Sequence, residues 1–179
     1  MSGNKINIKQ LIQEYLLDEG ISITKIPDPK LEFGFSFFFP PGNLPNGMQR
    51  GKSLNVLKPK GKQFIIFSIG TQIGDAHIHA LNSLEAEKKN QFFLSLRKIT
   101  LLKNLMLGLD VENNRFQINE QYFLRKDKII SKNTFFKNIR RILTCTEYCI
   151  ILLNEYCAGK VKMGDLSDPS FKSDFSLYS

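Results

Sequence analysis

Four phenylalanines alternate with other residues along one short segment of the chain. The segment Leu31–Pro41 reads Leu-Glu-Phe-Gly-Phe-Ser-Phe-Phe-Phe-Pro-Pro, which places Phe33, Phe35, Phe37 and Phe39 at a period of two. This period puts all four rings on one face of a β-strand. Burial of four such rings stabilises a fold by about 6–12 kcal/mol as an upper bound. The segment therefore predicts a strand that forms the inner surface of a hydrophobic core, and it carries no catalytic signature.

The length and composition of the chain are typical of an ordinary soluble globular domain. Its 179 residues are 42% hydrophobic and 23% charged, which is sufficient for a core without disulfides or a structural metal. We predict a single domain over residues 1–158 and a flexible C-terminal tail over 159–179, because the tail is polar, rich in serine and without periodicity. The N-terminal segment lacks the apolar stretch of a secretion signal, and Ile142–Leu153 is too short to span a bilayer. We expect a cytoplasmic protein.

The spacing of apolar residues predicts three helical regions. Apolar residues recur at helical spacing over 5–19, and Gly20 is expected to end this amphipathic helix. Helical spacing returns over 77–108, with Gly108 as the expected terminator. A last helix begins after a cap at Ser131 or Asn133 and runs to about residue 157. Its apolar side chains cover about two-thirds of the helix circumference, which is wider than the stripe of a surface helix.

The remaining segments with alternating or apolar residues predict strands. A short strand starts at Ile21 and ends before Pro27, and it precedes the phenylalanine strand. Two further strands are predicted over Ser53–Lys58 and Gln63–Thr71, and one or two more over residues 115–130. The resulting order is α-β-β-β-β-α-β(-β)-α. We therefore predict an α+β fold in which an antiparallel sheet packs with three helices.

The formal net charge of +8 indicates surfaces that attract anions. Basic residues gather in two places, one between residues 50 and 62 without an acidic residue and the other within residues 125–141, where Asp127 alone is acidic. Solvated surface is the simpler explanation of both clusters. The candidate anion-binding residues are Lys58, Lys60, Lys62, Lys137, Arg140 and Arg141.

The cysteines and histidines do not form a metal-binding or catalytic pattern. Cys145, Cys149 and Cys157 are crowded into the predicted last helix, where we expect reduced, buried thiols and no disulfide framework. His77 and His79 are the only histidines, and they diverge if they lie at the start of a helix. We expect no metal and no cofactor.

The sequence contains no recognised catalytic motif. It has no phosphate-binding loop, no dinucleotide-binding glycine pattern and no nucleophile elbow. Cys149 lies among aliphatic neighbours, unlike an exposed reactive thiolate. We predict no catalytic residues. The alternative is an enzyme whose active-site pocket is assembled from residues that are scattered along the sequence.

Three stretches of the chain carry a resemblance to a known family. They are Phe37–Pro41 followed by Leu54–Lys60, then His79–Arg97, and finally Ser131–Ile139. These stretches and the order of elements over about residues 5–158 resemble a family of uncharacterised, largely archaeal proteins grouped with the type III secretion chaperone-like fold. The resemblance implies that topology, a homodimer and binding to other proteins, and it implies no assigned activity. The chain departs from the secretion chaperones themselves in its net charge of +8, because they are typically acidic.

These observations favour a noncatalytic protein-interaction module, either chaperone-like or an adaptor, that pairs with itself or with another protein. The wide apolar arc of the last helix suggests an isologous interface, with Tyr148, Ile151 and Leu152 on the partner face. The alternative is a protein that binds nucleic acid or another polyanion through its basic residues. Binding of that kind falls steeply as salt is added.

Overall fold

The phenylalanine row lies on strand β2 (Leu31–Phe39) and faces the core, as predicted. In the computed structural model of the chain, Phe33, Phe35 and Phe37 are buried, and Phe39 is half-buried against the same cluster of apolar side chains. Phe38 points to the opposite face, where its side chain is 38% exposed. The row therefore forms part of the inner surface of the sheet.

The structure describes residues 7–43, 45, 47–48, 50–110, 112–125 and 129–158. The tail predicted over residues 159–179 lies outside the described residues. Among the helices of the described part, none is long and apolar enough to cross a membrane.

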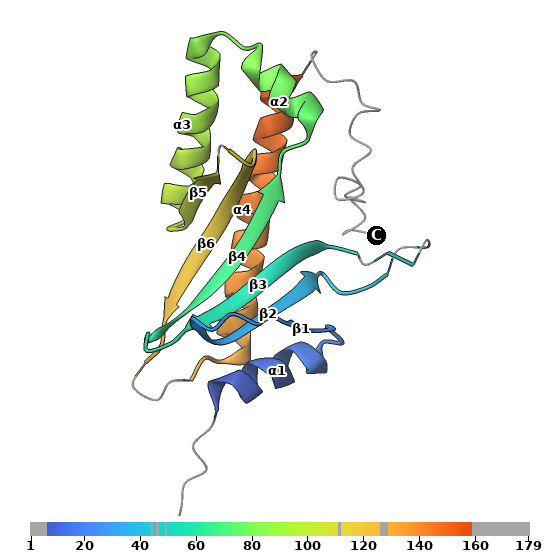
Figure 1. Cartoon of the computed structure of the whole chain (residues 1–179), viewed down its shortest axis with the longest axis vertical. Coiled ribbons are helices and arrows are strands. Elements are labelled where there is room, and N and C mark those ends of the chain that lie inside the picture. Colours follow the sequence, from blue (N-terminus) through green and yellow to red (C-terminus); the bar gives the residue numbers. More distant parts are fainter. Residues whose placement is uncertain are drawn as a thin grey trace, which may run out of the picture.

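Within the described residues, six strands form one antiparallel sheet (Figure 1). The strands beside β2 are β1 (Thr24–Lys25), β3 (Lys52–Pro59), β4 (Phe64–Gln72), β5 (Met106–Asp110) and β6 (Arg115–Phe123). Their order across the sheet is β1-β2-β3-β4-β6-β5, so β1 and β5 are the edges. Alternation along β4 and β6 puts Phe67 and Ile118 on the same inner face as the phenylalanine row, and both are fully buried.

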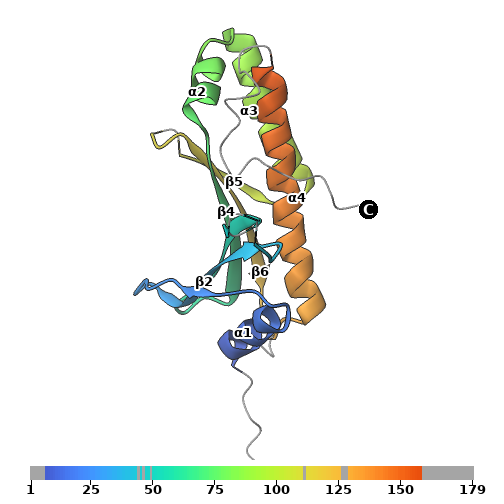
Figure 2. The ribbon, with the colours of Figure 1, turned by 90° about the vertical axis from the view of Figure 1, so that its right-hand side faces the viewer.

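The helices of the described part lie along the inner face of the sheet or beyond its ends (Figure 2). They are α1 (Ile8–Asp18), α2 (Asp75–Asn82), α3 (Ala86–Leu102) and α4 (Lys132–Cys157). The long helix α4 runs along the sheet, α3 packs beside α4, and α2 contacts the far end of α4 (Figures 1 and 2). At the other end, α1 lies by the start of α4, where the Tyr15 hydroxyl donates to the Ile130 carbonyl at 3.0 Å.

The wide apolar arc of α4 is explained by contacts within the chain. This helix packs on β4, β6, α2 and α3. Its buried side chains include Phe135 and Ile139 near the start, and Cys149 and Leu153 near the end. Because several elements of the same chain cover α4, the breadth of its arc does not require a partner.

Two of the helix ends follow the predicted local chemistry. Gly20 follows α1 with a positive φ of 67°, as expected for a glycine that ends a helix. Of the two candidate caps for α4, Ser131 is the one observed, and its side-chain oxygen accepts from the Thr134 N–H at 3.2 Å. The predicted boundaries of these two helices are correct to within a few residues.

The prediction for residues 77–108 is wrong in two respects. The region contains two helices, α2 and α3, so the described chain has four helices rather than three. Helix α3 ends in a turn in which Asn104 adopts a positive φ of 54° and the Leu105 N–H donates to the Thr100 carbonyl at 2.8 Å. The chain then enters β5. Gly108 therefore lies within an edge strand and does not end a helix.

Candidate functional site

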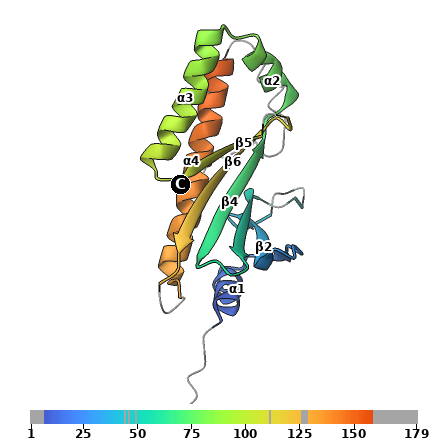
Figure 3. The same ribbon diagram turned by 60° about the vertical axis from the view of Figure 1, so that its left-hand side comes forward.

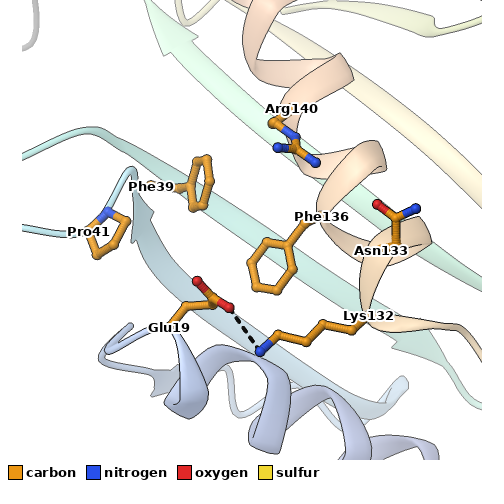
Figure 4. Close-up of a pocket in the computed structure, with 7 residues that line it drawn as sticks. All are labelled: Glu19, Phe39, Pro41, Lys132, Asn133, Phe136 and Arg140. Carbon is orange, nitrogen blue, oxygen red and sulfur yellow. Dashed lines mark ion pairs between the residues drawn. The ribbon is translucent and has the colours of Figure 1, made fainter. Parts of the chain in front are cut away.

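A groove of about 500 Å³ lies where the ends of α1 and β2 meet the first turns of α4 (Figure 4). Its floor is aromatic, because the rings of Phe39 and Phe136 lie side by side with their centroids 6.2 Å apart. Pro41 extends the apolar surface beyond the end of β2. The volume falls within the range of about 300–1,000 Å³ that is usual for small-ligand sites.

One side of the groove carries an ion-pair cluster that joins α1 to α4. The Lys132 ammonium lies 2.8 Å from the Glu19 carboxylate and 3.3 Å from the Asp18 carboxylate. The hydrogen bond to Glu19 is the main cause that raises the pKa of Lys132. Lys132 therefore stays charged at neutral pH, and its two acidic neighbours together exceed its charge by one negative charge.

Arg140 supplies a second cation at the groove, two helical turns after Lys132. The guanidinium is exposed and lies beside Phe39 and Phe136 in Figure 4. Among the residues that the structure describes, the ion pairs leave Arg140 without a carboxylate partner. The groove thus combines an aromatic floor with a guanidinium that pairs with no carboxylate of the described residues, a combination that suits an apolar group next to an anion.

Two of the six predicted anion-binding residues form ion pairs with carboxylates of the same chain. The Lys58 side chain is buried, and its ammonium donates to Glu32 at 2.7 Å and to the Lys62 carbonyl at 2.8 Å. Arg141 forms a two-point ion pair with Glu120, in which the Arg141 Nε lies 3.0 Å from the Glu120 Oε2. The Glu120 side chain is only 4% exposed. Both cations therefore balance carboxylates of the sheet rather than face a ligand.

The other four candidates are exposed but do not form one patch. Lys60 and Lys62 lie in the turn between β3 and β4, whereas Lys137 and Arg140 lie on α4. Of these four residues, Arg140 lines the groove. The structure thus brings one predicted anion-binding residue into the candidate site.

The predicted partner face on α4 is only partly at the surface. Tyr148 is 44% exposed and Ile151 is 43% exposed, so both are available to a partner. Leu152 is 8% exposed and belongs to the core. Leu152 therefore cannot contribute to a binding surface, because the apolar arc on which its selection rested is covered by the same chain.

The three cysteines are buried free thiols. Cys145 and Cys149 lie one helical turn apart on α4. The hydrogen bond with the Cys145 thiol is the main cause that raises the pKa of Cys149, and burial adds to it. Cys149 therefore stays protonated, and it lacks the exposure and thiolate character of a nucleophile.

This placement predicts that the cysteines of the native protein react very slowly with a thiol reagent. With Ellman's reagent, we expect almost no release of chromophore from the folded chain. The same protein in concentrated guanidinium should release the equivalent of all three thiols. Rapid reaction of one thiol in the folded state would contradict the burial described above.

The two histidines lie on α2 and diverge, as a helical start predicts. His77 is buried, with its Nε2 3.0 Å from the Asn154 Oδ1 on α4, whereas His79 is exposed. In the described part of the chain, no group of three or more histidine, cysteine or acidic side chains is arranged to hold a metal ion. His77 thus serves to join α2 to α4.

Sequence reasoning missed the groove because its residues come from three distant segments. Glu19, Phe39 and Phe136 are brought together only by the packing of α1 and α4 on the end of β2. One local signal was available. Phe39 is the last member of the phenylalanine row and precedes two prolines, so its ring marks the point where the sheet ends and a surface begins.

Comparisons with known proteins place the chain in a family and match its fold. A family described as an uncharacterized conserved protein matches residues 8–153. A crystal structure of an uncharacterized protein from Methanothermobacter thermautotrophicus is similar, with a TM-score of 0.71 and 19% identity over 83% of this chain and 98% of that chain. The YbjN protein of E. coli has a TM-score of 0.48 and 12% identity over 85% of this chain and 94% of that chain. No curated protein matches.

Proposed function

This chain belongs to the DUF2299 family of uncharacterised conserved proteins, and from that premise we propose that it is a noncatalytic protein-interaction module. The groove between α1, β2 and α4 is its binding site. The occupant is a polypeptide segment that carries a large apolar side chain next to an aspartate or glutamate. The observation that carries the proposal is the Arg140 guanidinium at the aromatic floor, which pairs with no carboxylate of the described residues.

We also propose the type III secretion chaperone-like grouping for this α+β topology. The support is the order of elements, a helix followed by an antiparallel run of strands and a long closing helix on the same sheet. Proteins of that group bind other proteins, which agrees with a groove that takes a peptide. The grouping does not indicate a reaction that the protein would catalyse.

The large apolar side chain of the peptide binds in the apolar part of the groove. Phe39, Pro41 and Phe136 line it with rings of low conformational entropy. An aromatic or leucine side chain that enters removes its own surface and the surface of these rings from water. Full burial of such a side chain contributes about 1.5–3 kcal/mol.

The aspartate or glutamate next to that side chain in the peptide binds in the charged part of the groove. Lys132 is already paired with Asp18 and Glu19, so Arg140 is the cation of the groove lining that is left for an entering carboxylate. Arginine holds a carboxylate through two parallel N–H···O bonds. Lys137, which is exposed one turn before Arg140, adds positive potential along the same helix.

The polyanion alternative has less support. Binding to nucleic acid requires a continuous row of free cations along the backbone. Lys58 is engaged with Glu32 and Arg141 with Glu120, which divides the basic residues into small separate groups. We therefore favour a peptide as the occupant.

Selection from a library of random linear peptides displayed on phage tests the proposal. Immobilised full chain should enrich peptides in which a large apolar residue adjoins aspartate or glutamate. Arg140→Glu should weaken binding of an enriched peptide by at least about tenfold, because it replaces attraction by repulsion. The matched control Lys62→Glu makes the same charge change in the β3–β4 turn, and it should leave the affinity unchanged.

Three outcomes contradict the proposal. The first is enrichment of no acidic and apolar consensus. The second is an Arg140→Glu variant that binds the enriched peptide as tightly as the original chain. The third is a loss of binding in both charge variants together with competition by single-stranded nucleic acid and a steep dependence on salt. The third outcome would support the polyanion alternative.

A further inference from the structure

The chain itself carries, outside the described residues, the sequence pattern that the groove is proposed to bind. Residues 159–179 contain Asp165 directly before Leu166 and Asp174 directly before Phe175. Each pair joins an acidic residue to a large apolar one. Both pairs follow α4, the helix that also forms one side of the groove. Because the groove and the two pairs belong to one chain, the length between them decides which pair can enter it.

The groove and the end of α4 are far apart. α1, which borders the groove, and α2 lie at opposite ends of α4 (Figure 3), and α4 ends at Cys157 on the side of α2. At about 1.5 Å per residue, Cys157 is about 32 Å along the helix from Phe136. Leu166 follows Cys157 by nine residues, a length of about 30–32 Å when fully extended. That leaves no length to turn into the groove. Phe175 follows by eighteen residues and has about 59–65 Å of chain.

The groove presents charges of opposite sign on the two sides of its aromatic floor. In Figure 4, Arg140 lies on one side of the two rings, and Glu19 lies with Lys132 on the other. Arg140 pairs with no carboxylate of the described residues. Lys132 pairs with both Asp18 and Glu19, so that side carries one excess negative charge. A segment that fits the groove therefore has an anion at one end and a cation at the other.

The residues before Phe175 have this arrangement of charges. Lys172 and Asp174 are two residues apart, so in an extended segment they project to the same side, about 7 Å from each other. Asp174 is complementary to Arg140, and Lys172 is complementary to the acidic side of the groove. The other pair lacks this feature, because Met163 precedes Asp165 by two residues.

We propose that residues 172–175 of the same chain bind in the groove, with the Phe175 ring on the aromatic floor and the Asp174 carboxylate on the Arg140 guanidinium. This inference rests on the proposed function, since it names the first segment that the groove takes. A flexible segment of eighteen residues has a root-mean-square length of about 21–25 Å, which is comparable with the span. The segment then meets the groove at an effective concentration of the order of 1 mM. A protein partner binds by displacing it.

The first experiment uses a fluorescent synthetic peptide with the sequence of residues 170–179 and measures its binding to the full chain by anisotropy. The chain's own segment competes with the peptide, so Phe175→Ser should lower the dissociation constant of the peptide at least about threefold. The matched control Phe171→Ser makes the same change beside a lysine and should leave the constant unchanged. Arg140→Glu should weaken the peptide more in the Phe175→Ser chain than in the original, because in the original chain it also releases the competitor.

Three results of this titration overturn the inference. One is a peptide that binds none of these chains. Another is a dissociation constant that is the same for the original chain and for Phe175→Ser. The last is a gain in affinity that is equal for Phe171→Ser and Phe175→Ser, since the contact then does not depend on the residue next to Asp174.

The second experiment locates the segment with a nitroxide attached through Ser176→Cys. The cysteines of the original chain are buried, so the reagent reacts at position 176. The nitroxide should broaden the amide signals of Phe39 and Phe136, and Arg140→Glu should abolish this broadening. A nitroxide-labelled chain mixed with an isotope-labelled chain should broaden nothing in the latter. Broadening that centres elsewhere, or that is equal in the mixture, overturns binding within one chain.

This inference and the peptide-binding function can fail separately. A phage-selected peptide that binds through Arg140 with the same affinity in the original and Phe175→Ser chains overturns only the contact within the chain. If the peptide of residues 170–179 binds through Arg140 but the phage selection yields no acidic and apolar consensus, the groove serves the chain's own segment. That result overturns the binding of partner proteins and supports the inference.

Discussion

Replacement of Phe35 by alanine is expected to lower the free energy of unfolding by about 3–5 kcal/mol, the range for large-to-small changes of buried aromatic residues. Phe35 is fully buried in the middle of β2, and its ring lies 5.2 Å from that of Phe33. The change removes the apolar burial of the ring and leaves a cavity at the inner face of the sheet. Urea unfolding followed by circular dichroism measures the loss.

Phe38→Ala is the matched control for this prediction. Phe38 is on the same strand but points to the other face, where it is 38% exposed. Its replacement should therefore destabilise the chain much less than Phe35→Ala. Equal losses for the two variants would mean that the alternation along β2 does not separate an inner face from an outer face.

Replacement of Arg141 by alanine is expected to destabilise the chain by about 2–4 kcal/mol. Breaking a buried ion pair by removing one partner usually costs about 3–5 kcal/mol, because a charge is left buried and unpaired. The Glu120 side chain is 4% exposed but that of Arg141 is 36% exposed, so water screens part of the interaction and the effect should be smaller. Urea unfolding at neutral pH measures this loss.

The neighbouring residue provides the control for Arg141. Arg140→Ala removes the same type of side chain from an exposed position on the same helix, and its effect should stay within about 0.5 kcal/mol. Adding Glu120→Gln to Arg141→Ala should restore part of the stability, because it removes the unpaired charge. If Arg140→Ala and Arg141→Ala had equal effects, the ion pair would contribute nothing to stability.

The parts of the fold that follow from local chemistry could be predicted from the sequence. The period of two in β2 depends only on the alternation of side chains along a strand, and Phe33, Phe35 and Phe37 lie in the core as expected. Gly20 and Ser131 end and begin helices for local reasons as well. The α+β class, with an antiparallel sheet, follows from the order of these elements.

The boundary between α3 and β5 could not be located from apolar spacing. Leu102, Leu105 and Met106 keep helical spacing across the point where the helix ends. Asn104 was the local signal, because asparagine is one of the few residues other than glycine that adopts a positive φ at a helix end. Gly108 was predicted to end the helix instead, although it lies in the edge strand β5.

The candidate site depends on contacts between distant segments. Phe39 and Phe136 are almost a hundred residues apart in the chain, and no local pattern brings them together. The sequence also did not show which cations are paired with carboxylates of the chain. Arg140 and Arg141 are adjacent in sequence, yet one lines the groove and the other pairs with Glu120 on β6.

Chemical-shift mapping of the full chain with a peptide enriched in the phage selection tests the central claim most directly. If the groove binds the apolar and acidic segment, the largest shifts will occur at Phe39, Phe136 and Arg140 and will saturate with one peptide per chain. Shifts that instead centre on Lys60–Lys62 or on Tyr148 and Ile151, or a spectrum that the peptide leaves unchanged, would contradict the account.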